Sequence, residues 1–267
     1  MLAEQRYREI MGLLSKEGSV KSGTIRQILG VSGETVRRDL ETMEAQGLLR
    51  RTHGGAISLE QSAESSLYTS FKRRETQNAG MKEEVAQIAA RYIREGEAIA
   101  LDSGTTALAL ARVIRQKFHN LTVVTNSLAV LQELGTAPGI TVVVTGGVYR
   151  PDEDAFSSDF ATLIFSRLNV DTFFLTTCGI SVERGVTYQR MDEIIVQDKM
   201  MQAAARTIVI ADSSKLGCNS MVKMCDIDRI SMIITDSKAT PAQIEPFRNV
   251  NIPVVLPDGA SKEQYQL

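Results

Sequence analysis

The sequence predicts an α/β protein with a mostly parallel sheet, preceded by a small N-terminal domain of winged helix-turn-helix architecture. The first 57 residues contain three amphipathic helical stretches and two short β-like runs around a glycine pair. From Met81 onward, helical stretches alternate with short apolar runs, a pattern typical of a parallel sheet. These runs are continuous in Val, Ile and Leu, which indicates strands that are buried on both faces.

Length and local composition predict the domain boundaries. A chain of 267 residues exceeds the usual size of one domain. We expect residues 1–57 to form the first domain and residues 81–267 the second. Residues 58–80 are polar, rich in Ser and weakly patterned, so they are the expected linker, with a helical turn around Phe71 to Glu75.

The overall composition excludes several classes of protein. The apolar fraction of 43% and the charged fraction of 23% are those of a globular chain. Cys178, Cys218 and Cys225 lack CxxC spacing, so we expect free thiols rather than a disulfide framework or a metal site. No apolar run approaches the ~20 residues of a membrane span, and no signal peptide is evident at Met1. The sequence therefore predicts a cytoplasmic protein without a cofactor, a metal or a membrane partner.

The first domain has recognisable helix boundaries. The first helix follows from the helical spacing of apolar residues between Tyr7 and Leu14. Gly30 ends the second helix, Ser32 is the expected N-cap of the third, and Gly47 is its expected C′ residue. The third helix buries the stripe Val36, Leu40 and Met43.

The third helix has the pattern of a DNA recognition helix. With its apolar stripe buried, Arg38 lies near the opposite face, flanked by Thr35 and Arg37. Arg50 and Arg51 on the wing would neutralise phosphates or enter a minor groove. Residues 1–57 hold nine basic and seven acidic side chains, although the whole chain has a net charge of −2. An ordinary helical bundle with solvated arginines would show the same periodicity.

The motif VSGETVRRDLETMEAQGLLRRTHGGA, from Val31 to Ala56, closely resembles the signature of DeoR/GlpR-type bacterial repressors. In that family a turn ending in Val-Ser precedes Thr-Ile/Val-Arg-Arg-Asp-Leu, and a basic wing closes on His-Gly-Gly-Ala. The resemblance implies binding to double-stranded operator DNA. For His53 the alternatives are a phosphate contact and a neutral turn residue. The candidate DNA-binding residues are Ser32, Thr35, Arg37, Arg38, Arg50, Arg51 and His53.

The second domain is predicted to contain helices and strands in alternation. Helices are expected over 82–95, through Leu108 to Val113, near 128–134, and over 159–168, 192–205 and 241–248. Strands are expected over 97–101, 121–125, 140–145, 171–176, 207–211, 232–235 and 253–256.

Small, polar or glycine residues follow the predicted strands, at the edge where ligands bind in open parallel sheets. The segment from Ser103 to Thr106 opens a helix, where unpaired amides favour an anion, and Lys215 adds a charge. Asp102 would repel an anion, so it is assigned to a hydroxyl or to capping. In any one of these loops, the polar residues after the strand could instead be ordinary helix N-caps. The candidate ligand-binding residues are Asp102, Ser103, Gly104, Thr105, Thr106, Asn126, Ser127, Gly146, Gly147, Gly179 and Lys215.

These strand ends also resemble DeoR sensor-domain motifs, namely LDSGTT, VVTNS, VVTGGVYR, CGIS, GVT and IVIADSSKLG, and the resemblance spans about residues 5–238. It implies a fold similar to phosphosugar isomerases and coenzyme A transferases, and a phosphorylated sugar or sugar derivative as effector. One departure concerns the segment after Gly146-Gly147. Family members often carry a glycine there, whereas this chain has Ser157 and Ser158 after the acidic run 152–154.

The sequence allows two alternatives to a repressor. An isomerase-like enzyme would need a base, and Asp192, Glu193, Asp198 and Lys199 stand near the predicted site, although such residues more often form a solvated helix face. No nucleophile–His pair or Walker-type loop supports catalysis. The other reading is a positive regulator or architectural DNA binder without a ligand. The sequence favours a non-enzymatic repressor of a carbohydrate-metabolism operon that acts as a homo-oligomer, a dimer or a tetramer.

Overall fold

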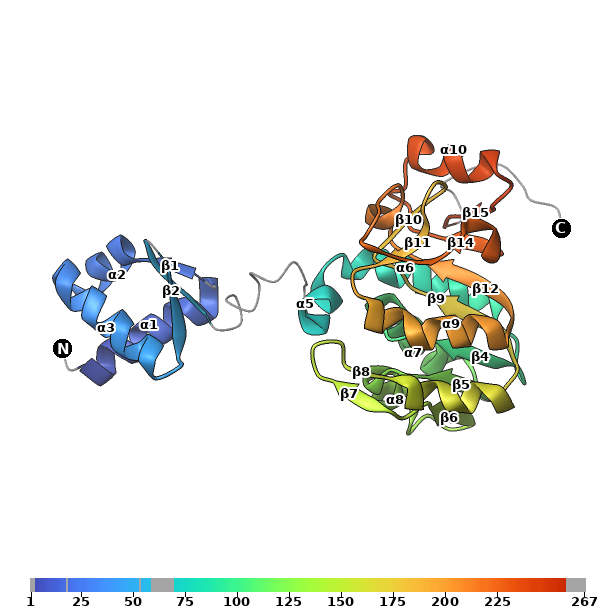
Figure 1. The fold of residues 1–267 in the computed structure, drawn as a ribbon, viewed down its shortest axis with the longest axis horizontal. Helices are drawn as coiled ribbons and strands as arrows, with labels where there is room; N and C mark the ends of the chain where they lie inside the picture. Colours follow the sequence, from blue (N-terminus) through green and yellow to red (C-terminus); the bar gives the residue numbers. More distant parts are fainter. Residues whose placement is uncertain (1–2, 18, 53, 59–69, 258–267) are drawn as a thin grey trace. The chain divides into compact units, whose positions relative to one another are not determined.

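The computed structural model describes residues 3–17, 19–52, 54–58 and 70–257 (Figure 1). The chain divides into two compact units, Met1–Thr69 and Ser70–Leu267. The predicted wing residue His53 lies outside the described residues. Within the described residues, no helix is both long enough and apolar enough to cross a membrane.

The N-terminal unit is a winged helix-turn-helix, as the sequence predicts. Its three helices pack against an antiparallel sheet in the order β1-β3-β2. The short strand β1, between the first two helices, was not predicted, because three residues give no usable periodicity. The elements are α1 (Ala3–Glu17), β1 (Ser19–Lys21), α2 (Ser22–Leu29), α3 (Gly33–Ala45), β2 (Leu49–Thr52) and β3 (Gly55–Ser58).

Local chemistry fixes the position of α3. The hydroxyl of Ser32 accepts a hydrogen bond of 3.1 Å from the amide of Thr35, so Ser32 is the N-cap that the sequence predicts. Arg6 of α1 donates two hydrogen bonds, of 2.6 and 2.8 Å, to the buried carboxylate of Asp39. This bidentate pair ties α1 to α3 beneath the face that carries Arg38.

The C-terminal unit is built on a seven-stranded sheet in which every pairing is parallel. The mostly parallel sheet predicted from the Val/Ile/Leu runs is confirmed. Along the sheet the strands are β15 (Val254–Val255), β14 (Met232–Ile234), β12 (Ala204–Ile210), β9 (Val170–Leu175), β4 (Ala98–Leu101), β5 (Leu121–Thr125) and β6 (Ile140–Val144).

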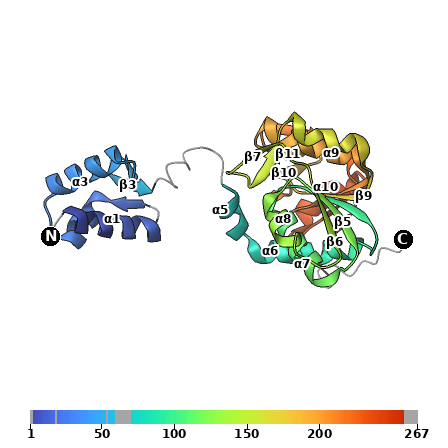
Figure 2. The same ribbon diagram turned by 90° about the horizontal axis from the view of Figure 1, so that it is seen from below.

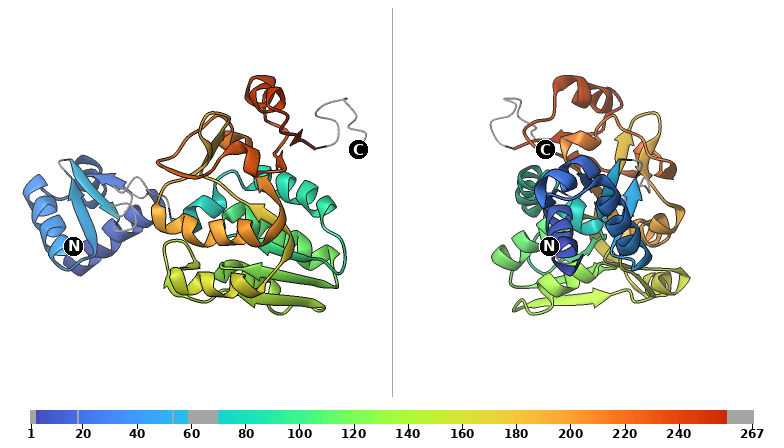
Figure 3. Two further views of the ribbon diagram at one scale, coloured as in Figure 1. Left: turned by 45° about the vertical axis from the view of Figure 1, so that its right-hand side comes forward. Right: turned by 90° about the vertical axis from the view of Figure 1, so that its left-hand side faces the viewer.

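Helices cover both faces of the sheet. Neighbouring residues of a strand point to opposite faces, so they pack in different cores. Ile99 and Leu101 pack in a core with α6 and α7, whereas Ala100 between them packs in a second core with α9. Figures 2 and 3 show the helices on the two faces. The helices are α6 (Ala79–Ala89), α7 (Thr105–Lys117), α8 (Leu128–Leu134), α9 (Ile194–Ala203) and α10 (Pro241–Asn249).

Several elements differ from the prediction. The helical turn expected around Phe71 to Glu75 is α5 (Phe71–Thr76), and α6 already begins at Ala79, so residues 70–80 of the predicted linker are largely helical. The predicted helix over 159–168 is a 3-10 helix, η2 (Asp159–Arg167). Short antiparallel strands lie outside the main sheet, where turn-rich sequence hid their pattern. They are β7 (Val148–Arg150), β8 (Ala155–Ser157), β10 (Gly179–Ser181), β11 (Gly185–Tyr188) and β13 (Val222–Cys225).

Candidate functional site

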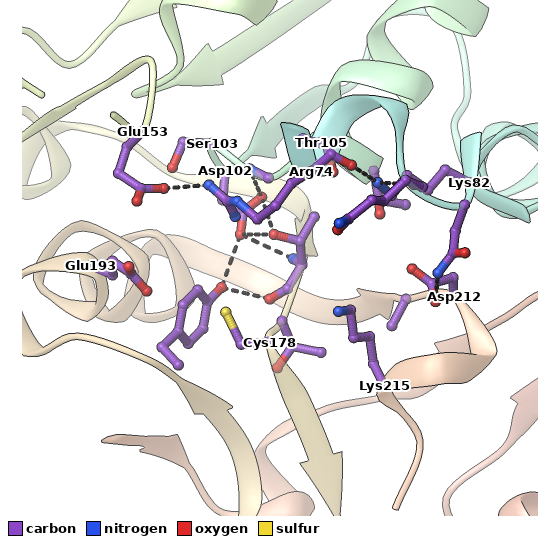
Figure 4. A pocket seen from close by; sticks show the side chains of 18 of the residues that line it. Arg74, Lys82, Asp102, Ser103, Thr105, Glu153, Cys178, Glu193, Asp212 and Lys215 are labelled. Carbon is purple, nitrogen blue, oxygen red and sulfur yellow. Dashed lines mark hydrogen bonds and ion pairs between the residues drawn. The ribbon is translucent and has the colours of Figure 1, made fainter. Parts of the chain in front are cut away.

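A cavity opens at the carboxyl ends of three neighbouring strands, β12, β9 and β4 (Figure 4). It holds about 720 Å³ of empty space, including the part open to solvent. The loops after these strands supply one wall each, and α5 and α6 supply another. The residues that line it are Arg74, Gln77, Asn78, Lys82, Asp102, Ser103, Gly104, Thr105, Thr106, Glu153, Thr176, Thr177, Cys178, Tyr188, Glu193, Gln197, Ala211, Asp212 and Lys215.

Asp102 organises the floor of this cavity. Its carboxylate is completely buried and accepts hydrogen bonds from the amide and hydroxyl of Thr176, the amide of Gly104 and the hydroxyl of Tyr188. Burial raises the pKa of Asp102. Because donors from the protein already surround this carboxylate, Asp102 shapes the loop that follows β4.

Three cationic side chains reach the cavity from different elements. Arg74 comes from α5, Lys82 from α6 and Lys215 from the loop after β12. The ammonium group of Lys82 donates to the carbonyl oxygens of Arg74 and Gln77, and burial lowers the pKa of Lys82 to about 8. Helix α7 begins at the same cavity, and its N-cap Gly104 provides no side-chain cap. Cations and an uncapped helix N-terminus together favour an anionic ligand.

Two acidic side chains stand on another side of the cavity. Glu153, from the turn between β7 and β8, accepts a hydrogen bond of 2.6 Å from Arg74. Glu193 precedes α9, and burial raises its pKa. Cys178 also lines the cavity, and burial raises the pKa of its thiol to about 11. Cys178 is therefore a neutral thiol at physiological pH.

The structure brings together six of the eleven candidate ligand residues. These are Asp102, Ser103, Gly104, Thr105, Thr106 and Lys215. Asn126 lines a small adjoining chamber, and the hydroxyl of Ser127 caps α8 by accepting from the amide of Val130. Gly146 and Gly147 follow the edge strand β6, and Gly179 lies in β10; these three do not line the cavity.

The segment after Gly146-Gly147, where the sequence departs from the family pattern, has an unusual backbone. Gly147 has a φ of 104°, and a Cβ added there would come within 2.9 Å of Ala161 Cβ. The neighbouring Ser158 has a φ of 145°, a conformation that favours glycine, and its buried hydroxyl has no hydrogen-bond partner. A serine therefore occupies a backbone conformation that glycine adopts with less strain.

Sequence reasoning missed much of the cavity wall. Arg74, Gln77 and Asn78 lie in the segment assigned to the linker, and Lys82 falls in a helix with no motif. The sequence suggests Glu193 only as a candidate catalytic base, not as a ligand-binding residue. Of its companions, Asp192 lines only the adjoining chamber, and Asp198 is exposed and accepts from Gln202.

The candidate DNA-binding residues that the structure describes lie at the start of α3, on α3 and on β2, and His53 is not described. Ser32, Arg37, Arg38 and Arg50 are exposed, whereas Thr35 and Arg51 are half-buried. The side chain of Arg38 is 75% exposed and lies 3.2 Å from Glu34. Arg37 pairs with Glu34 and Glu41, and Arg51 also pairs with Glu41. The hydroxyls of Ser32 and Thr35 lie 2.8 Å apart at the helix start, and Arg50 is exposed.

Two family models match the chain. The DeoR-like helix-turn-helix domain matches residues 6–62, and the DeoR C-terminal sensor domain matches residues 77–237.

Similar curated proteins match almost end to end. The HTH-type transcriptional regulator GlpR of Haloferax volcanii is 32% identical over 98% of this chain and all of its own length. The transcriptional repressor AccR of Agrobacterium fabrum is 32% identical over 88% of this chain and 90% of its own. The L-fucose operon activator of Haemophilus influenzae is 29% identical over 90% of this chain and 95% of its own.

Solved structures resemble only part of the chain. Ribose 5-phosphate isomerase A of Methanocaldococcus jannaschii is 18% identical, with a TM-score of 0.39, over 52% of this chain and 55% of its own. The likeness concerns the backbone alone.

Proposed function

The chain belongs to the DeoR family of transcriptional regulators, and we propose that it represses a carbohydrate-metabolism operon under the control of a phosphorylated sugar or sugar derivative. The observation that carries the proposal is the cavity at the strand ends, where Arg74, Lys82 and Lys215 meet the uncapped start of α7. The effector would bind there through its phosphate.

The phosphate is best served by the loop from Ser103 to Thr106. Backbone amides at the start of α7 point toward an anion, and the hydroxyls of Thr105 and Thr106 can donate to its oxygens. Lys82 from α6 and Lys215 from the loop after β12 would supply positive charge. Asp102, already surrounded by donors, would hold the loop in the required conformation.

The DNA-binding surface would comprise Ser32, Thr35, Arg37, Arg38, Arg50, Arg51 and His53. Arg38 carries the argument for base contact, because it is the most exposed of the paired arginines on α3. Glu34 bonds to both Arg37 and Arg38, and these arginines hold the pKa of Glu34 well below its usual range. DNA phosphates would therefore compete with Glu34 and Glu41 for the guanidinium groups.

Chain continuity suggests how a bound effector affects the DNA-binding unit. Helix α5 follows the interdomain segment directly and contributes Arg74 to the cavity. An anion that draws Arg74 away from Glu153 would shift α5, and with it the chain that leads to the N-terminal unit. The protein would act as a dimer or tetramer, so that two recognition helices reach two half-sites.

One relative favours a second candidate, which is positive regulation. The Haemophilus influenzae protein is named an operon activator, whereas the Agrobacterium fabrum protein is named a repressor. Both readings need the same DNA-binding surface and differ in the direction of the transcriptional response. An enzymatic role receives no support, since these relatives are named as regulators.

A thermal-shift panel of sugar phosphates tests the proposal. A ligand that binds the folded state raises stability by RT ln(1 + [L]/Kd), so saturation at about 100 Kd stabilises by about 2.7 kcal/mol. The variant Thr105→Glu puts a carboxylate at the start of α7 and should lose the shift while it keeps its affinity for operator DNA. Thr136→Glu, at an exposed site, is the matched control and should retain the shift. An equal shift in Thr105→Glu and wild type would remove the phosphate assignment.

A further inference from the structure

The cavity has a second, acidic end that the phosphate assignment leaves unused. An adjoining chamber shares four lining residues with the main cavity, namely Ser103, Glu153, Glu193 and Gln197. Figure 4 shows Glu153 and Glu193 on the side of the cavity away from Lys82 and Lys215. Lys82 and Lys215 therefore lie at one end of the cavity, together with Asp212. Glu153 and Glu193 lie at the other end, where Arg150 and Arg190 also line the adjoining chamber.

Buried oxygen atoms at the acidic end have no hydrogen-bond donor. Within the described residues they are Asn126 Oδ1, Glu153 Oε1, both carboxylate oxygens of Glu193, and Gln197 Oε1. Gln197 is only 2% exposed, and the side chain of Glu193 is 9% exposed. The amide nitrogen of Asn126 donates to Phe156 O, so its oxygen remains as the free acceptor. Buried acceptors are normally satisfied, so these atoms indicate a ligand that brings donors.

The charges at this end are incompletely paired. Arg74 donates to Glu153 at 2.6 Å, and Arg190 donates to Asp192 at 2.6 and 2.9 Å. Arg150 also lies 3.6 Å from Asp192. Glu193 Oε1 lies 3.9 Å from Arg190, and Arg74 and Arg190 both favour its charged form, but neither arginine donates a hydrogen bond to its oxygens. A buried carboxylate in this position gains most from a ligand that carries a positive charge.

We infer that the effector is a phosphorylated amino sugar, held by its phosphate at the cationic end and by a protonated primary amine beside Glu193. This inference rests on the proposed function. An ammonium group has three donors and no acceptor, which matches a cluster of acceptors from Glu193, Glu153, Gln197 and Asn126. A sugar hydroxyl offers one donor, and its own lone pairs would face the remaining oxygens.

The ligand side of the test compares sugar phosphates that differ at one substituent. Isothermal titration calorimetry on the full chain would use glucosamine 6-phosphate and galactosamine 6-phosphate against glucose 6-phosphate and galactose 6-phosphate. At least one amino sugar should bind about 10- to 100-fold more tightly than its hydroxyl counterpart, the ratio that a charge-assisted hydrogen bond gives. N-acetylation, which removes the positive charge, should abolish that advantage.

The protein side of the test removes the charge that recognises the amine. Glu193→Gln should bring the affinity ratio between amino and hydroxyl sugar phosphate below about threefold, because a neutral amide loses the charge-assisted part of the bond. Glu183→Gln, at an exposed site between β10 and β11, is the matched control and should keep the wild-type ratio. If Glu193→Gln fails to fold, the N-acetylated ligands decide the question alone.

The outcomes separate this inference from the function on which it rests. If both hydroxyl sugars bind at least as tightly as their amino counterparts, the amine assignment is wrong while the phosphosugar sensor stands. An unchanged ratio in Glu193→Gln likewise overturns the assignment. If no sugar phosphate of the panel binds, the proposed function fails, and the amine assignment fails with it.

Discussion

Gly104 offers a sharp test of the packing around the proposed effector site. Its backbone has φ −76° and ψ 154°, which an alanine adopts without strain. A Cβ added at Gly104, however, would lie 2.0 Å from Thr176 Oγ1 and 2.5 Å from Thr176 Cβ. Thr176 is buried, and its amide and hydroxyl both donate to Asp102. Gly104→Ala must therefore displace Thr176 and break part of the Asp102 network.

The expected cost combines two effects. Overpacking a well-packed site costs about 1–3 kcal/mol, and a buried hydrogen bond left unmade costs about 1–3 kcal/mol. A total of about 2–6 kcal/mol lowers the melting temperature of a domain of this size by roughly 5–25 °C. The loop should also lose its affinity for sugar phosphates, because its amides no longer point into the cavity.

Thermal unfolding followed by circular dichroism measures the stability change, and calorimetry measures ligand binding. Gly80→Ala is the matched control, since an added Cβ there meets nothing within 4 Å and the residue lies in α6. It should leave stability unchanged or raise it by up to about 1 kcal/mol. If Gly104→Ala has the same melting temperature as the wild type, Thr176 can move without cost, and the reasoning about a rigid loop is refuted.

Three further predictions concern the effector site, the recognition helix and the strained serine. Because burial lowers the pKa of Lys82 to about 8, sugar-phosphate affinity should fall as pH rises through that value. In Lys82→Arg the side chain stays charged, so the affinity should not fall as pH rises; calorimetry from pH 6.5 to 9 checks this. Arg38→Ala should weaken operator binding by about 1–3 kcal/mol in fluorescence anisotropy and relax base preference at one position; equal losses on operator and random duplex would show a phosphate contact instead. Ser158→Gly should stabilise the chain by about 1 kcal/mol in thermal unfolding, since it relieves a φ of 145°; a lower melting temperature would contradict that strain.

Much of the fold follows from periodicity. Val/Ile/Leu runs predicted the parallel sheet, and the expected strand over 121–125 and helix over 128–134 match β5 and α8 to the residue. Ser32 was found as an N-cap because serine before a helical stripe has a local physical reason. By contrast, α5 is predicted only as a helical turn within the linker, because its six residues hold a single apolar side chain, Phe71, and carry little helical pattern.

The composition of the cavity was harder to predict, because strand order is a property of the whole sheet. The loops after β4, β9 and β12 meet because these strands are neighbours, whereas Gly146 and Gly147 follow the edge strand β6. No spacing in the sequence distinguishes the two cases. Arg74 and Lys82 enter the cavity from helices outside the sheet, so they carry no strand-end signal at all.

The account depends on a coupling between effector and DNA, and fluorescence anisotropy on the chain's own promoter measures it directly. We expect a Kd that is lower than for random duplex at the same salt concentration, and a sugar phosphate that changes the promoter Kd by about 5- to 150-fold. The proposed coupling is contradicted if promoter and random duplex bind with equal affinity. It is also contradicted if a bound sugar phosphate leaves the promoter Kd unchanged.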